Sequence, residues 1–138
     1  MLCQSCYSLC PGRICARCLA GLRPAAERIL EGGVRLIAGF EHVGAARELV
    51  HAFKYRGFTA YADLVVEMIG PRLPVLPIVP VPRAWTRQVL HGIDPARELG
   101  RRLAKYRGVP LCEVLVAPVH SRRRAGGDHS RPPPRFAT

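Results

Sequence analysis

The chain has 138 residues, 49% of them hydrophobic, and a formal net charge of +11 at pH 7. This length suits one modest domain with a small appendage, and it is long enough to bury a hydrophobic core. No apolar run approaches the roughly 20 residues that span a bilayer, and cysteines stand where a signal peptide would place its apolar segment. We therefore expect a cytoplasmic protein with no membrane span.

The positive charge comes almost entirely from arginine, because Lys54 and Lys105 are the only lysines. The planar guanidinium of arginine matches the geometry of phosphate and carboxylate groups. A phosphorylated ligand or nucleic acid is therefore the expected partner. The alternative interpretation is that the arginines serve solubility alone.

Five cysteines lie within the first eighteen residues, and four of them form C-x-x-C pairs. The pairs are Cys3 with Cys6 and Cys15 with Cys18. Two such turns direct four thiolates to one centre, which is typical of a closed tetrahedral zinc site with a structural role. Cys10 is a spare thiol that could replace a neighbour. A disulfide framework is disfavoured in a cytoplasmic chain, and a redox pair is disfavoured by the clustering, so we expect residues 1–20 to form a zinc ribbon.

An α/β domain is expected over residues 21–118, from alternating helical and strand-like patterns. The expected elements are a short helix over 19–30, a strand over 34–40, a helix that starts at Val43 and runs to Phe53, and a helix with a face from Tyr61 to Ile69. Glycines follow three of these segments, at Gly32, Gly57 and Gly70, where helices commonly end.

A proline-rich apolar run, Val75 to Val81, opens the central unit of the chain. Its prolines limit pairing as a central strand, because each lacks the N–H that a ladder needs. A basic loop from Arg83 to Ile93 follows. Next comes a helix, in which Asp94 is suited to cap the free amides and Pro95 to the first helical position.

The basic loop is a candidate anion site. In an open α/β sheet, a loop that follows a strand lies where ligands bind, and the next helix points its amide-rich end toward them. Arg83, Arg87, His91 and the turn at Asp94 would then surround an anion. The alternative is a solvated basic loop between two ordinary elements.

The last part of the chain changes in character. Leu111 to Ala117 is a second β-rich run, and its Cys112 is expected to be a buried small residue. Residues 119–138 carry five arginines against one acid, with three consecutive prolines and almost no apolar residue. We expect a basic, proline-rich mobile loop or tail there.

Three segments, in this order, resemble one known family. They are the cysteine-rich N-terminus, F-K-Y-R-G at Phe53 to Gly57, and V-P-V-P at Val79 to Pro82 followed by L-H-G-I-D-P-A-R-E-L-G-R-R-L-A at Leu90 to Ala104. Together they resemble the ComF family of phosphoribosyltransferase-like competence proteins. The resemblance covers most of the chain up to about Ala117.

The resemblance implies a zinc ribbon followed by a partial type I phosphoribosyltransferase fold, which is a mainly parallel sheet flanked by helices. Val79 to Val81 would be its first core strand, and the loop after it would face the pyrophosphate of phosphoribosyl pyrophosphate, with Mg²⁺. The implied pyrophosphate-binding residues are Lys54, Arg56, Arg83, Arg87, His91 and Gly92. His120 to Arg135, with Arg122, Arg123 and Arg124, would match the mobile loop that folds over the substrate.

The sequence departs from the family pattern in ways that bear on catalysis. His91 stands where the family usually has arginine, and Ile93 stands where it has an aromatic residue. The chain also lacks the paired acids and the T-T-G-type loop that hold the ribose and the 5′-phosphate in these enzymes. We therefore expect binding of phosphoribosyl pyrophosphate or pyrophosphate, while the missing loop argues against phosphoribosyl transfer. A short form or fragment with exposed sheet edges, able to pair with a second copy, is also expected.

Two other functional hypotheses remain. One is a non-catalytic zinc-ribbon protein that binds nucleic acid and is linked to DNA uptake, with phosphate contacts that make its affinity salt-dependent. The other is an unstable fragment with no function of its own, which a melt without a cooperative transition would reveal.

Overall fold

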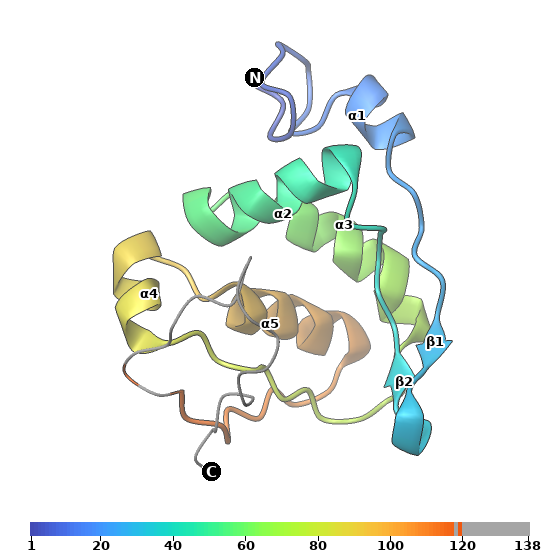
Figure 1. The fold of residues 1–138 in the computed structure, drawn as a ribbon, viewed down its shortest axis with the longest axis vertical. Helices are drawn as coiled ribbons and strands as arrows, with labels where there is room; N and C mark the ends of the chain where they lie inside the picture. Colours follow the sequence, from blue (N-terminus) through green and yellow to red (C-terminus); the bar gives the residue numbers. More distant parts are fainter. Residues whose placement is uncertain (118, 120–138) are drawn as a thin grey trace.

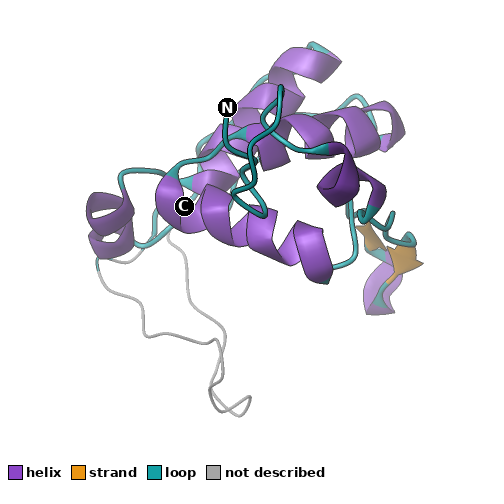
Figure 2. Ribbon diagram, turned by 90° about the horizontal axis from the view of Figure 1, so that it is seen from above, coloured by secondary structure: helices purple, strands orange, loops and turns teal. Residues whose placement is uncertain are grey.

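The computed structural model of the protein describes residues 1–117 and 119. Helices form most of the body, and a small two-stranded sheet lies at one side (Figures 1 and 2). In chain order the elements are α1 (Ala16–Ala20), β1 (Arg28–Ile29), the 3-10 helix η1 (Glu31–Gly33), β2 (Arg35–Leu36), α2 (Gly44–Arg56), α3 (Ala60–Ile69), the 3-10 helix η2 (Gly70–Arg72), α4 (Trp85–His91) and α5 (Pro95–Arg107). In the described residues, no helix has the length and apolarity needed to cross a bilayer.

The mainly parallel sheet expected from the sequence is wrong for the described part of the chain. The two named strands pair antiparallel, with Arg28 opposite Leu36. In the described part of the chain, parallel pairing is reduced to a bridge between Ile78 and Leu111. Pro80 and Pro82 have no N–H with which to extend the pairing beyond Ile78. The expected first core strand, Val79 to Val81, is therefore not a strand.

The helix expected over residues 19–30 is also wrong. Helix α1 ends at Ala20, and the chain after it is extended, with Pro24 bridged to Phe40. The residue before a proline is disfavoured in a helix, and the segment before α2 offers an extended partner. The strand expected over 34–40 is confirmed only at Arg35–Leu36.

Helices α2, α3 and α5, by contrast, are confirmed, and they build the core. Val65 and Ile69 of α3 pack with Leu103 of α5. Leu49 and Phe53 of α2 are buried against α3 from the other side. Helix α3 therefore lies between α2 and α5 (Figure 1), which makes it the structural centre of the protein.

Gly100 allows the extended segments to approach α5 closely. A Cβ placed there would lie 3.2 Å from Leu111 Cδ1 and 3.5 Å from both Ile78 Cγ2 and Pro80 Cβ. The side chains of the bridged pair therefore pack on α5. Along the same segment, the alternate residues Val79 and Val81 remain exposed, as expected when successive side chains of an extended chain point to opposite faces.

The expected basic loop, Arg83 to Ile93, contains a helix, so the loop prediction is corrected. Helix α4 runs over Trp85–His91 and ends at Gly92, whose φ of 67° closes a left-handed cap. No proline or glycine interrupts residues 83–91. A short helix is therefore free to form between the proline-rich segment and Asp94.

The cap predicted at Asp94 is confirmed and does more than start α5. Its Oδ1 accepts hydrogen bonds from the amides of Ala96 at 3.0 Å and Arg97 at 3.2 Å. Its Oδ2 accepts one from the amide of Arg83 at 2.9 Å. Asp94 is buried, so one carboxylate joins both ends of the segment that contains α4.

Replacing Asp94 with alanine is expected to lower the free energy of unfolding by about 1–3 kcal/mol, because the helix loses its cap and the Arg83 amide loses its partner. Urea unfolding followed by circular dichroism measures the change. Asp94→Asn, which keeps one acceptor oxygen, should lose less. Glu113→Ala is the control, because its pair with Arg97 is exposed and worth about 1 kcal/mol or less. Equal losses in Asp94→Ala and Glu113→Ala would contradict the assignment.

Candidate functional site

Four cysteine sulfurs meet at the N-terminal end of the protein. The Sγ atoms of Cys3, Cys6, Cys15 and Cys18 all lie within 4.8 Å of one another. Tetrahedral zinc with sulfur ligands at about 2.3 Å requires sulfur separations of about 3.8 Å, and Cys6 and Cys15 are 3.7 Å apart. The predicted set of four thus fits a metal ion such as zinc.

Main-chain hydrogen bonds shape the cluster and exclude the spare thiol. The amide of Tyr7 donates to the carbonyl oxygen of Cys3 at 3.0 Å, closing the first C-x-x-C turn. The amide of Cys15 donates to the sulfur of Cys3 at 3.3 Å, which brings the second pair to the first. Cys10 is outside the set of four, and its thiol donates to the carbonyl oxygen of Gly12 at 2.8 Å.

The thiols differ in their readiness to ionise. A hydrogen bond with the Ser8 hydroxyl lowers the pKa of Cys6 to about 6. Burial raises the pKa of Cys18 to about 12. Metal binding requires thiolates, so the cluster combines an easily ionised ligand with a buried ligand that a bound cation would ionise.

The cysteine-rich segment is attached to α2 and α3 by side chains that lie between its cysteines. The Oε1 atom of Gln4 accepts a hydrogen bond from the amide of Ala60 at 3.0 Å and so caps α3 from outside. Arg13 forms an ion pair with Asp63 at 2.7 Å. The ring of Tyr7 lies 5.2 Å from the guanidinium carbon of Arg56, and its hydroxyl accepts a hydrogen bond from that side chain.

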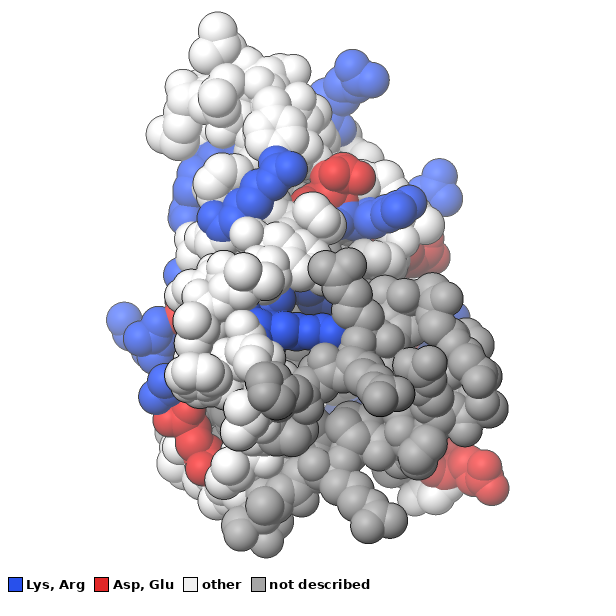
Figure 3. All heavy atoms as spheres, turned by 60° about the vertical axis from the view of Figure 1, so that its left-hand side comes forward, with Lys and Arg blue, Asp and Glu red and all other residues white. Residues whose placement is uncertain are grey.

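A second feature is a cleft of about 650 Å³ between the end of α2, the segment before α4 and the start of α5. Lys54, Arg83 and Arg87 line it together, beside Asp94. Figure 3 shows Lys and Arg side chains in a hollow of one face. Lys54 thus shares one opening with Arg83 and Arg87, which follow it by about thirty residues in the sequence, and we call this opening the basic cleft.

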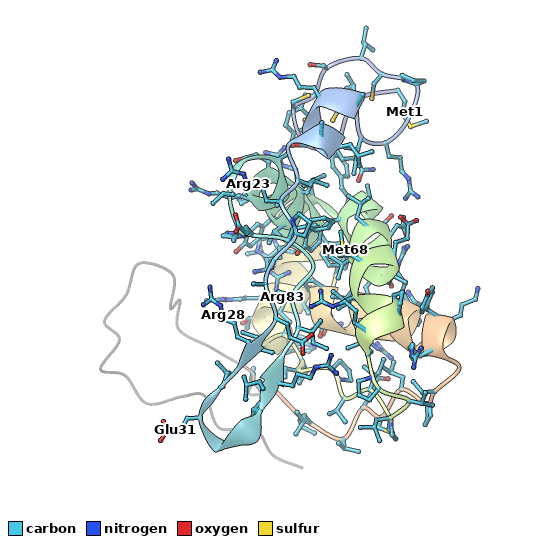
Figure 4. The ribbon with its side chains drawn as sticks, turned by 90° about the vertical axis from the view of Figure 1, so that its right-hand side faces the viewer. Met1, Arg23, Arg28, Glu31, Met68 and Arg83 are labelled. Carbon is cyan, nitrogen blue, oxygen red and sulfur yellow. The ribbon has the colours of Figure 1, made fainter. Side chains whose placement is uncertain are left out.

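Arg83 is fixed within this cleft. Its guanidinium donates to the carbonyl oxygens of Lys54 at 2.8 Å and Ile93 at 3.2 Å, and it lies over the ring of Tyr55 at 5.5 Å. Figure 4 shows Arg83 in the middle of the molecule, away from the hairpin tip at Glu31. The side chain therefore joins the end of α2 to the turn before α5.

The cleft has an excess of positive charge. Burial lowers the pKa of Arg83 and the charge of Arg87 acts in the same direction, while Tyr55 and Asp94 oppose them. Among the described residues of the lining, Asp94 is the only acid, and both of its oxygens accept hydrogen bonds from backbone amides. Among the described residues, neither Lys54 nor Arg83 forms an ion pair. The arginines paired with carboxylates are Arg13, Arg35, Arg72, Arg97, Arg101 and Arg102.

The remaining predicted site residues lie elsewhere. Arg56 contacts Tyr7 of the cysteine-rich segment. The ring of His91 lies edge-on to Tyr55 with centroids 5.0 Å apart, and Gly92 caps α4; neither lines the basic cleft. The predicted loop residues Arg122, Arg123 and Arg124 lie outside the described part of the chain.

Sequence reasoning missed the residues that organise the two sites. Tyr55 lies between Arg83, His91 and His51, with the His51 ring centroid at 4.7 Å. The i, i+4 spacing of His51 and Tyr55 on α2 was a signal for that contact. No comparable signal links Gln4 to Ala60, because 56 residues separate them.

We expect the purified protein to bind one zinc ion, and Cys18→Ser to lose it to a competing chelator while its melting temperature falls by several degrees, since metal binding favours the folded state. Metal analysis and thermal unfolding measure both effects. Cys10→Ser is the matched control and should keep zinc, because its sulfur is outside the set of four. Loss of zinc from Cys10→Ser to the same extent would show that the ligand set is wrong.

Gln4→Ala is expected to lower the free energy of unfolding by about 1 kcal/mol, the usual effect of losing a helix cap. The control is Gln88→Ala on α4, which should change it by less than about 0.5 kcal/mol. Denaturant unfolding of the zinc-loaded protein compares the two. A Gln4→Ala value equal to the control would mean that the contact with Ala60 contributes nothing.

Comparison with known proteins identifies no relative of this chain. No protein-family model, no curated protein and no solved structure matches the chain. The metal cluster and the basic cleft are therefore the two observations on which a function is built.

Proposed function

We propose that the protein is a ComF-like, phosphoribosyltransferase-type protein that binds pyrophosphate or phosphoribosyl pyrophosphate in the basic cleft. The observation that carries the proposal is the meeting of Lys54, Arg83 and Arg87 in one cleft. The sequence resemblance also supports it, because these three are among the six residues that it implied as pyrophosphate ligands. The cysteine cluster supplies a structural zinc ribbon.

The cations would act by complementary means. Lys54 is exposed at the end of α2, so its ammonium can follow a bound anion as a mobile point charge. Arg83 is held by two carbonyl oxygens, so its charge is already in place before a ligand arrives, which reduces the cost of ordering the site. A bound anion would also reduce the repulsion between the positive charges of Arg83 and Arg87.

The amides at the start of α5 do not supply the anion site that the sequence suggested. The Asp94 carboxylate already accepts the amides of Ala96 and Arg97. The proposed site therefore depends on side-chain cations. Among the described lining residues Asp94 is the only acid, and its oxygens already accept backbone amides. These residues therefore do not fit a Mg²⁺ ion held by protein carboxylates, and we derive no step through one.

The net charge of +11 favours nucleic-acid binding as a second candidate. Such binding would be dominated by phosphate contacts, and the affinity would fall steeply as salt rises. If pyrophosphate displaces single-stranded DNA from the protein, both ligands bind in the cleft near Lys54. DNA binding unaffected by Lys54→Ala would place nucleic acid elsewhere.

Calorimetric titration of the zinc-loaded protein with pyrophosphate tests the proposal. Lys54→Ala should weaken binding about tenfold or more, because a charge-assisted contact contributes about 1.5–3 kcal/mol. The chain offers a matched control in Lys105→Ala, the other lysine, which is exposed near the end of α5. Arg56→Ala should also bind normally, because Arg56 is turned to Tyr7.

Two results would overturn the proposal. One is the absence of binding heat in a protein that shows a cooperative zinc-dependent melt. The other is equal loss of affinity in Lys54→Ala and Lys105→Ala, which would indicate general charge attraction without a defined cleft.

A further inference from the structure

The basic cleft has apolar side chains on its lining beside its cations. Four of its lining residues, Phe40, Val50, Tyr61 and Leu99, are half-buried, and we call them the apolar floor. Lys54, Arg83 and Arg87 lie on the same lining. The cleft is thus amphipathic, and its volume of about 650 Å³ falls in the range of pockets that hold organic ligands.

The apolar floor is a side of the core that the described residues leave partly open. Phe40, Tyr61 and Leu99 pack against the cluster of Val65, Ile69 and Leu103 while they also line the cleft. Phe40 precedes α2, Tyr61 lies on α3 and Leu99 lies on α5, so three separate parts of the fold contribute to the apolar floor. Water on this floor finds few hydrogen-bond partners, and an apolar group that displaces it gains affinity.

The aromatic residues of the cleft are suited to a flat group beside an anion. The rings of Phe53 and Tyr61 are tilted against each other, with centroids 6.0 Å apart. Burial raises the pKa of Tyr61, so its phenol stays neutral and adds no negative charge that would repel an anion. Among the described residues, Asp94 is the one carboxylate on the lining, and its oxygens face backbone amides.

We propose that the ligand of the basic cleft is a phosphate monoester or diphosphate that carries an aromatic group, with the phosphate at Lys54, Arg83 and Arg87 and the ring on the apolar floor. This inference rests on the proposed anion site and specifies its ligand class. Pyrophosphate alone fills the basic part and leaves the apolar floor in water.

Calorimetric titration of the zinc-loaded full chain with phenyl phosphate and with methyl phosphate tests the inference, since the two share the charged group and differ in the ring. Phenyl phosphate should bind about tenfold tighter, as expected when much of an aromatic ring is buried. Equal affinities for the two monoesters would overturn the aromatic ligand class and leave the anion site intact. The absence of binding by both monoesters and by pyrophosphate would overturn the anion site and this inference together.

The same substitution, valine to glutamine, made at two positions tests where the ring of phenyl phosphate binds. Val50→Gln places a polar group on the apolar floor, and it should reduce the advantage of phenyl phosphate to less than about threefold while methyl phosphate binds as before. Val89→Gln is the control, because Val89 is exposed on α4 and does not line the cleft. A full advantage for phenyl phosphate in a folded Val50→Gln protein would overturn the assignment of the ring to this floor.

Discussion

The buried carboxylate of Asp94 is the contact on which the functional half of the structure depends. It caps α5 through one oxygen and holds the amide of Arg83 through the other. The two ends of the segment that contains α4 are therefore held together by this carboxylate. Arg83 then reaches back to the carbonyl oxygen of Lys54, so the same arrangement connects α5 to the end of α2 and defines the cleft between them.

The cysteine-rich segment anchors the opposite side of the helical body. Gln4 caps α3, Arg13 pairs with Asp63 of α3, and Tyr7 holds Arg56 at the end of α2. Arg102 of α5 also pairs with Asp63, so one carboxylate joins the N-terminal segment, α3 and α5. A metal bound by the cysteines would stabilise the turns that present Gln4 and Tyr7. It would thereby also stabilise α2 and α3, which these side chains contact and which contain no metal ligand.

The character of the basic cleft depends on Lys54 and Arg83, which form no ion pair among the described residues. Elsewhere on the described surface, arginines such as Arg35 and Arg97 are matched by glutamates. In the cleft, Asp94 is committed to backbone amides, so the charges of Lys54 and Arg83 remain available to a ligand. The partly open core beneath them adds an apolar surface. An anion with an organic group matches both features better than a simple salt ion does.

The sequence by itself determined the elements whose signals are local. The C-x-x-C spacing identified the four clustered thiols, the Asp94-Pro95 pair marked the start of α5, and helical periodicity identified α2 and α3. Tertiary structure decided what depends on distant partners. Residues 19–30 are largely extended because Phe40 and its neighbours pair with them. In the described part of the chain, the expected parallel sheet is reduced to the bridge at Ile78, because prolines lack the N–H donors that would extend it. The sequence likewise indicated Lys54, Arg83 and Arg87. Only tertiary packing decided that Arg83 lies over Tyr55 in the cleft and that Arg56 turns to Tyr7. Contacts between residues dozens of positions apart leave no periodic pattern in the sequence.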